Sequence, residues 1–281
     1  MISHTKHKSS CLHLIICFIL FFSLCGENSL YGQDRTKEHR FNKEYIQNLF
    51  DDSLNIYSSP YQWDSADYLR LSAVVGTGLV LFIFDEDIYD WSQKNKTVFS
   101  EEASNYVTDF GHGIFLAGLS TVLYTAGELS DNDRLRKTGL HSLQSWLTTG
   151  FLVLTFKFCT GRFRPEEGEG AYSFRPLQFS NKNHSFPSGH AASAFAVAAV
   201  VSEYSDSFVL DAFCYGLAAG VALSRVHLQE HWMSDVFIGS VIGHFIGKKV
   251  CGLNSQKHQN KFQLGLDCSA HHAGLTLSFS F

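Results

Sequence analysis

Three short stretches of the sequence carry cationic, imidazole and carboxylate side chains at spacings that suit chemistry on a phosphate group. They combine a lysine with two arginines, a serine and a glycine ahead of one histidine, and a second histidine four residues ahead of an aspartate. The residues are Lys157 and Arg164, then Ser188, Gly189 and His190, then Arg225, His231 and Asp235. Each stretch lies at the end of an apolar segment, so we expect all three to meet at one end of a helical body.

The cationic residues and the helix start predict an anion pocket. Cations at the edge of an apolar body lose hydration, and a shared anion compensates for that loss. Arg164 and Arg225 offer planar forks for a phosphate-like group, and Lys157 adds a point charge. Ser188 can cap a helix whose first free N–H groups, from Gly189 on, face an anion. The pocket suits a tetrahedral dianion.

The remaining residues supply reactivity. His231 and Asp235 are four residues apart, so on one helix face the carboxylate can orient one ring nitrogen and leave the other as a nucleophile. A histidine so oriented can attack phosphorus and form a phospho-enzyme. His190 can protonate the departing alkoxide and then activate water. We therefore predict His231, His190 and Asp235 as the catalytic residues.

A competing motif overlaps the third stretch. Residues 227–231 read H-x-x-E-H, a zinc-hydrolase spacing that places His227 and His231 on one helix face beside Glu230. That alternative leaves the lysine, the arginines and His190 unexplained, so we expect neither a metal nor a cofactor. His112 and His244 both lie on apolar segments and are interpreted as interior residues rather than ligands.

Six apolar segments must position these residues. They span about 66–85, 107–128, 138–158, 189–204, 208–225 and 232–248 and are mostly free of proline. The sequence therefore predicts an all-α fold, a six-helix bundle. Apolar and polar residues alternate over 262–266 and 275–281, which predicts a small C-terminal β-hairpin packed on the helices.

The chain is predicted to have four parts. Residues 1–32 form a signal peptide, with Lys6 and Lys8 ahead of a short apolar core. A polar N-terminal arm covers 33–65, the helical catalytic domain covers 66–250, and a tail with the hairpin covers 251–281. An exported chain permits a disulfide between Cys251 and Cys268, and buried free thiols are the alternative.

Composition narrows the class of protein. Of 281 residues, 45% are hydrophobic and 17% are charged, which excludes a disordered chain. A net charge of -5 gives no electrostatic footprint for nucleic acid. Several apolar segments are short for a bilayer or carry polar residues. We expect membrane association and keep a soluble periplasmic bundle as the alternative.

The three stretches read K-x6-R-P, P-S-G-H and S-R-x5-H-x3-D, and in this order they resemble the type 2 phosphatidic acid phosphatase and vanadium haloperoxidase superfamily. The resemblance covers roughly residues 66–248 and suggests a bacterial exported member. The positions that complete the match are Pro165, Pro187 and Ser224. It implies metal-independent phosphomonoester hydrolysis, with His231 as nucleophile, Asp235 as its orienting partner and His190 as acid and base. The phosphoryl oxygens would be bound by Lys157, Arg164, Ser188, Gly189 and Arg225.

The sequence thus predicts a phosphatase that acts through a phosphohistidine on phosphomonoesters or diphosphates. We expect a lipid-linked substrate at the periplasmic side of the cell envelope, and no nucleic-acid partner. The alternatives are a soluble periplasmic non-specific acid phosphatase acting on small phosphate esters, a non-enzymatic envelope scaffold, a zinc hydrolase and a vanadium haloperoxidase. The natural substrate and the oligomeric state stay open.

Overall fold

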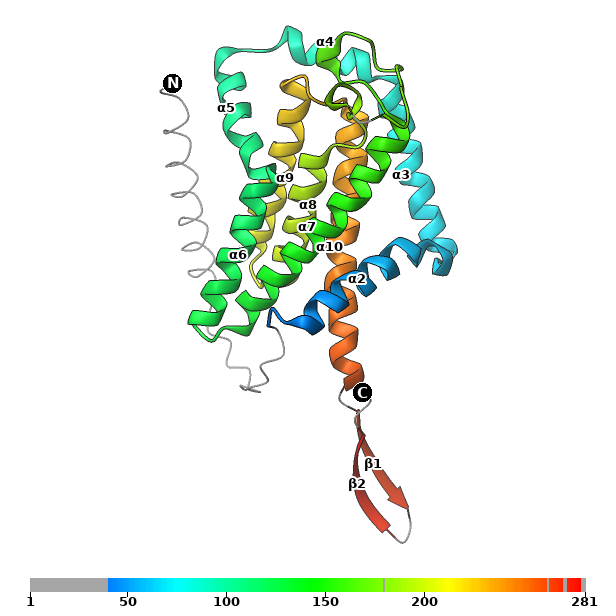
Figure 1. Cartoon of the computed structure of the whole chain (residues 1–281), viewed down its shortest axis with the longest axis vertical. Coiled ribbons are helices and arrows are strands. Elements are labelled where there is room, and N and C mark those ends of the chain that lie inside the picture. The colour runs from blue at the N-terminus through cyan, green and yellow to red at the C-terminus, as the bar shows by residue number, and fades with distance from the viewer. Residues whose placement is uncertain (1–39, 179, 262, 270–271, 279–281) are drawn as a thin grey trace.

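A computed structural model describes residues 40–178, 180–261, 263–269 and 272–278. Its long helices run side by side in an elongated bundle (Figure 1). The expected signal peptide, 1–32, lies outside the described residues. The bundle confirms the all-α fold class predicted for the catalytic domain.

Long helices build the body of the bundle, and shorter elements lie at its two ends. The long helices are α3 (Ser65–Ile83), α5 (Val98–Thr108), α6 (Gly113–Leu129), α7 (Asp133–Thr160), α8 (Gly189–Glu203), α9 (Phe208–His227) and α10 (Met233–Lys261). Helix α4 (Asp85–Lys94) lies at the upper end in Figure 1, and α2 (Lys43–Ser58) crosses near the lower end. Strands β1 (Gln263–Ser269) and β2 (His272–Ser278) pair antiparallel beyond α10.

Several predicted boundaries are wrong. The segment 107–128 is two helices, because α5 ends at Thr108 and α6 begins at Gly113 after a 3-10 turn. The polar arm, interpreted from the sequence as a surface arm or short amphipathic helices, contains the helix α2, which buries Asp52 and Ile56 against the bundle. Helix α10 passes the expected boundary at 250, since no proline interrupts it. The strands project beyond α10 in Figure 1, whereas we expected a hairpin packed on the helices.

Of the two alternatives for Cys251, a disulfide with Cys268 or a buried free thiol, the structure favours the second. Cys251 is a free thiol with 1% of its surface exposed. On α10 its thiol contacts the Tyr204 hydroxyl. Cys268 belongs to β1, and its side chain lies outside the described residues.

Gly161 turns the chain from α7 into the loop that carries part of the site. It caps α7 in the left-handed conformation, with φ of 59°, and its N–H donates to the carbonyl of Lys157. A Cβ here would lie 1.8 Å from the carbonyl oxygen of Arg175, so only glycine fits. Arg162 therefore enters the loop immediately after the helix.

Helices α8 and α10 touch through their backbones. A Cβ added at Gly243 of α10 would lie 2.0 Å from the carbonyl oxygen of Ala192 in α8. Near the upper end the Ser188 N–H donates to the Asp235 carbonyl over 3.0 Å. This close approach holds the first turns of the two helices together, and both turns carry predicted site residues.

The outer surface of the bundle is apolar. Within the described residues three helices are long and apolar enough to cross a membrane, over Ser65–Ile83, Phe208–His227 and Met233–Ser255. Helix α3 faces outward along most of its length, and Leu69 is 72% exposed. An apolar surface this extensive favours contact with lipid over water, and it supports the expected membrane association.

Gly243→Ala should lower the melting temperature of the detergent-solubilised protein. The added methyl group must push α8 and α10 apart, and overpacking of this kind destabilises by about 1–3 kcal/mol. Gly252→Ala is the matched control, because Gly252 is in the same helix and has nothing within 4 Å of its added Cβ. Equal melting temperatures for both variants would contradict the close-packing role of Gly243.

Candidate active site

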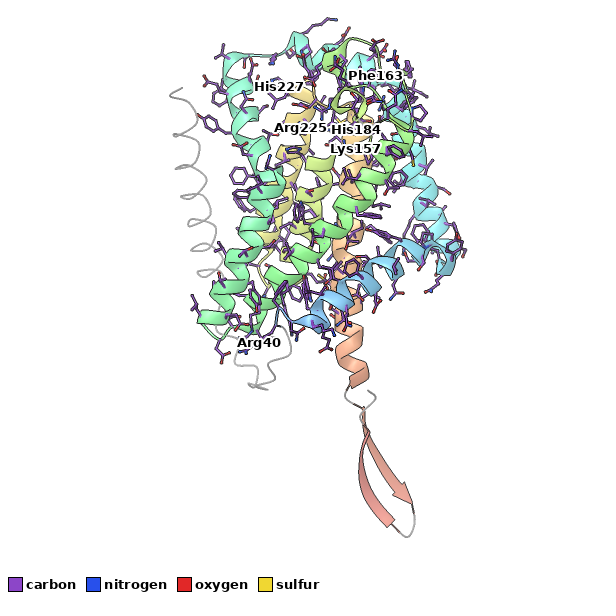
Figure 2. All side chains as sticks on the ribbon, in the orientation of Figure 1. Arg40, Lys157, Phe163, His184, Arg225 and His227 are labelled. Atoms are coloured by element: carbon purple, nitrogen blue, oxygen red, sulfur yellow. The ribbon has the colours of Figure 1, made fainter. Side chains whose placement is uncertain are left out.

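The three predicted stretches meet at the upper end of the bundle. Lys157 is in the last turn of α7, Ser188 is the N-cap residue of α8, and Arg225 is in the last turn of α9. Figure 2 shows Lys157 and Arg225 at this end, far from Arg40 at the opposite end. The structure therefore brings together residues that are separated by tens of positions in the chain.

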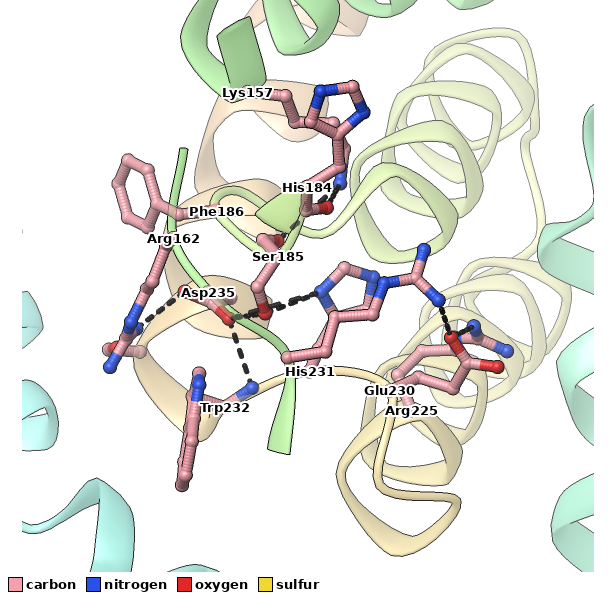
Figure 3. A network of polar contacts seen from close by, with 12 residues as sticks. Lys157, Arg162, His184, Ser185, Phe186, Arg225, Glu230, His231, Trp232 and Asp235 are labelled. Carbon is pink, nitrogen blue, oxygen red and sulfur yellow. Dashed lines mark hydrogen bonds and ion pairs between the residues drawn. The ribbon is translucent and has the colours of Figure 1, made fainter. Parts of the chain in front are cut away.

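His231 and Asp235 lie together, although not on one helix as expected. Helix α10 begins at Met233, so His231 belongs to the turn that precedes it. His231 Nδ1 lies 3.9 Å from Asp235 Oδ2, and the two side chains are 2% and 0% exposed (Figure 3). Because Nδ1 faces the carboxylate, Nε2 is the ring nitrogen left for a ligand.

Ser185 links the two residues, and sequence reasoning missed it. Its hydroxyl donates to Asp235 Oδ2 over 2.5 Å and lies 3.4 Å from His231 Nδ1 (Figure 3). The Trp232 N–H donates to the same carboxylate oxygen over 3.0 Å. Asp235 Oδ2 is therefore held by two donors beside the histidine. The only sequence signal is the position of Ser185, three residues ahead of Ser188.

Arg164 and Arg225 share the carboxylate of Glu230. Arg164 Nη1 donates to Glu230 Oε2, and Arg225 Nη2 lies 3.1 Å from the same oxygen (Figure 3). Thr108 also accepts from Arg225 Nη1, over 2.8 Å. The carboxylate balances part of the positive charge, and the sequence analysis considered Glu230 only within the zinc motif.

Several donors in the cationic cluster are buried without a protein partner. The Nε atoms of Arg164 and Arg225 and the hydroxyl of Ser188 have no hydrogen-bond partner among the described residues. Ser188 was expected to cap α8 with its side chain, but it makes no such bond. Buried polar atoms are rarely left unpaired. These three unpaired donors belong to residues that were predicted to bind phosphoryl oxygens. An oxyanion ligand would supply the acceptors that they lack.

Lys157 completes the cluster. Its ammonium group donates to the carbonyl of His184, and Cε lies 3.9 Å from where a Cβ at Gly189 would be. Burial, then the positive charges of Arg164 and Arg225, lower the pKa of Lys157 to about 7. The charged form is therefore penalised until an anion arrives.

His190 lies in the first turn of α8, half-buried beside the cluster. Burial and then the charge of Arg225 lower its pKa to about 3, so its imidazole is neutral at pH 7. The His112 ring lies 5.8 Å from the His190 ring between centroids. We expected His112 and His244 in the interior, but both are exposed. His112 is the N-cap residue of α6, because glycines on both sides end one helix and begin the next, and the His244 ring lies 2.9 Å from the Tyr215 hydroxyl on the outside of α10.

The geometry argues against the zinc motif. His227 ends α9, and its ring nitrogens lie 3.3 Å from the Ser92 hydroxyl and 2.9 Å from the Ser100 hydroxyl. His231 follows a turn in which Gln229 has φ of 62°, so the two histidines do not share a helix face. Glu230 is bound to arginines. Within the described part of the chain no three His, Cys, Asp or Glu residues are grouped to hold a metal ion.

Known proteins resemble this chain over the same region. Residues 139–257 match the model of the PAP2 superfamily. A lipid A 1-phosphatase of Rhizobium etli is 28% identical over 203 residues, covering 66% of this chain and 82% of that protein. A lipid A 1-phosphatase of Porphyromonas gingivalis is 35% identical over 101 residues, which cover 35% of this chain and 20% of that protein. The crystal structure of Aquifex aeolicus LpxE is 20% identical, with a TM-score of 0.49, and covers 60% of this chain and 95% of that chain.

The affinity of the protein for inorganic phosphate should fall as the pH rises above about 7. Lys157 loses its proton in this range because its pKa is lowered to about 7, and the anion then loses one cation. Lys157→Arg keeps its charge throughout. Phosphate itself ionises identically in the experiments with wild type and with Lys157→Arg. The ratio of their dissociation constants at each pH therefore reports only the loss of the proton from Lys157. A ratio that does not change from pH 6 to 9 would contradict this assignment.

Proposed function

We propose that this chain removes a phosphate group from a lipid, on the premise that its residues 139–257, which match the PAP2 superfamily model, make it a member of that superfamily. The reaction would proceed through a phosphohistidine at His231 and without a metal. As a phosphatase of this type it is a phosphoric monoester hydrolase. The observation that carries the proposal is the cationic cluster, with its unpaired buried donors, beside an oriented neutral histidine.

The cationic cluster would bind the phosphoryl group. Arg164 and Arg225 would turn their free donors to its oxygens, and the Ser188 hydroxyl would add another hydrogen bond. Lys157 would regain its proton as the dianion compensates for burial. Such prearranged charge stabilises the transition state of phosphoryl transfer more than the ground state, because negative charge spreads over the transferred oxygens.

His231 would act as the nucleophile. Burial holds its pKa well below the usual range, so its Nε2 carries a free electron pair at pH 7. Nε2 attacks phosphorus, the bond from phosphorus to the ester oxygen breaks, and that oxygen leaves with the electron pair. Asp235 and Ser185 hold the Nδ1 side of the ring and stabilise the positive charge that develops there.

His190 would move the protons. The arriving dianion raises its pKa from about 3, so the ring can bind a proton and give it to the departing oxygen. The neutral ring then takes a proton from a water molecule, whose oxygen attacks the phosphohistidine. The N–P bond breaks, and inorganic phosphate and free His231 are restored.

A lipid substrate is supported by the apolar surface and by the relatives. The helices around the site expose large apolar side chains, including Phe99 at 81% and Ile83 at 61%. A bilayer around such a surface would deliver an amphipathic phosphate ester directly to the helix ends. The relatives named above are lipid A 1-phosphatases, so the 1-phosphate of lipid A is the lead substrate. A soluble acid phosphatase would leave this surface without a function.

His231→Ala should abolish phosphate release from lipid A by the purified full-length chain in detergent. No other described side chain is placed to accept the phosphoryl group, and loss of a nucleophile commonly lowers turnover by about 10⁴-fold or more. His227→Ala is the matched control, because His227 lies four residues away and contacts serines outside the site.

Phosphatidic acid and an aryl phosphate should be assayed beside lipid A, each with and without a chelator. Release from a lipid that survives the chelator supports the proposal. Activity of His231→Ala within tenfold of wild type would exclude the nucleophile, and loss of activity with chelator would restore a metal mechanism. Equal turnover of the aryl phosphate would instead favour a non-specific phosphatase.

We place the site on the periplasmic side of the inner membrane, in line with the expected signal peptide. Cys159 is exposed two residues from Lys157, whereas Cys214 and Cys251 are buried. A membrane-impermeant thiol reagent should therefore label Cys159 in cells with a permeabilised outer membrane. The assay uses a background in which the cysteines with undescribed side chains, Cys11, Cys17, Cys25 and Cys268, are replaced by serine, and in it the signal should disappear in Cys159→Ser. Labelling that requires lysis of the inner membrane would place the site in the cytoplasm.

A further inference from the structure

Arg162 is a buried arginine that neither the predicted pocket nor the phosphohistidine mechanism uses. It lies two residues before Arg164 but turns away from the cationic cluster, with 0% of its surface exposed. Figure 3 shows its guanidinium on the far side of Asp235 from His231. Nη1 donates to Asp235 Oδ1 over 2.6 Å, and Nη2 donates to Asp85 Oδ2 over 2.8 Å.

Aromatic rings surround this guanidinium, and each of its three nitrogens donates a hydrogen bond. The rings of Phe82, Phe174 and Trp232 lie 4.7, 5.8 and 5.5 Å from its central carbon. Its Nε donates to the carbonyl of Ala171 over 2.9 Å. The planar group therefore has one orientation, and a fork in one orientation fixes the carboxylate that it binds.

Asp85 anchors the arginine from the first turn of α4. It is 1% exposed, and its Oδ1 accepts from the Ser234 N–H over 2.9 Å. The Ser234 hydroxyl bonds to both the arginine and Asp85. Asp85 thus ties α4 to the first turn of α10, where Asp235 follows Ser234 directly.

These contacts assign the two oxygens of Asp235 to different partners. Oδ1 faces Arg162, while Oδ2 accepts from Ser185 and Trp232 and faces His231. A carboxylate that rotated about its Cβ–Cγ bond would lose the guanidinium bond and turn Oδ2 away from the imidazole. The side chain is also fully buried, so its negative charge needs a cation nearby.

We propose that Arg162, anchored by Asp85, is a positioning residue that keeps Asp235 ionised and turned toward the nucleophilic histidine. The orienting unit is therefore Asp85, Arg162, Asp235 and Ser185 rather than Asp235 alone. Arg162 touches neither substrate nor reacting atoms and acts through Asp235. This inference rests on the proposed role of His231 and adds the residues that make that role possible.

The test is the double variant Arg162→Met with Asp85→Asn, assayed on lipid A in detergent. It removes one buried charge of each sign, so it avoids leaving Asp85 unpaired. Without the guanidinium, Asp235 takes up a proton more readily. The acid limb of the profile of kcat/KM against pH should therefore move up by about 1 unit. Misorientation of His231 should lower kcat by about tenfold or more, with KM within about threefold.

The matched control is Arg175→Met with Asp87→Asn, which removes the same charges from the same loop and the same helix turn. Arg175 stacks on Phe163 at 5.2 Å, and both control residues are exposed. The control variant should have the same kcat as wild type, and the acid limb of its profile of kcat/KM against pH should lie at the wild-type pH. His231→Ala is run in parallel. If it stays active, the phosphohistidine mechanism fails independently of Arg162.

An acid limb at the wild-type pH would overturn the proposal whatever the fall in kcat. A purely structural role reduces the number of folded molecules without moving the limb. Should the double variant fail to fold, Arg162→Lys serves instead, because it keeps the charge and loses the fork. Its kcat should fall by about fivefold or more with the limb unmoved, and a wild-type kcat would overturn the proposal.

Discussion

The close approach of α8 and α10 is the constraint on which the site geometry depends. A backbone hydrogen bond from the Ser188 N–H to the Asp235 carbonyl joins the start of α8, which carries His190, to the start of α10, which carries Asp235. Side chains larger than hydrogen at Gly243 would separate these helices. Packing well below the site thus helps to set how far His190 lies from Asp235 and from the neighbouring His231.

A second requirement is to bury charge at the helix ends without leaving it unpaired. The upper end of the bundle contains two separate ionic groups. One joins Arg164 and Arg225 to Glu230, and the other joins Arg162 to two aspartates. In the first group the Nε atoms of both arginines have no partner, whereas every nitrogen of Arg162 donates a hydrogen bond, so only the first group has whole donor atoms available for a ligand.

The sequence points to the two arginines of the first group but not to their carboxylate partner Glu230, and in the second group it points to Asp235 but not to Arg162 or Asp85. The helix-end cations and histidines stand in short patterns whose spacing carries chemical meaning, so their convergence could be inferred. Asp85 lies 150 residues before Asp235 in the chain and on a helix that the hydrophobic pattern did not reveal. Arg162 lies in a polar loop, and no spacing in the sequence connects it to Asp85 or Asp235. Only tertiary packing shows that the loop folds over it.

The polar residues of α7 show the same limit. Gln144 is one of the polar residues that made that segment ambiguous as a membrane span, and the structure gives a reason for such residues. Gln144 donates to Asp52 of α2 over 3.0 Å, and the Thr148 hydroxyl lies 2.8 Å from the Ser53 hydroxyl of α2. They are the docking face for a helix, which hydropathy along one segment cannot indicate.

The carboxylate of Glu230 has a consequence for which anions can enter. A ligand that reaches the Nη atoms of Arg164 and Arg225 as well as their free Nε donors would compete with a carboxylate that is tethered beside them and therefore present at a high effective concentration. A singly charged ion offers the arginines little more than Glu230 already does. A dianion with three oxygens offers more charge and more acceptors. If these arginines bind the phosphoryl group as proposed, Glu230 would favour ligands of higher negative charge, because a weaker anion could not displace it.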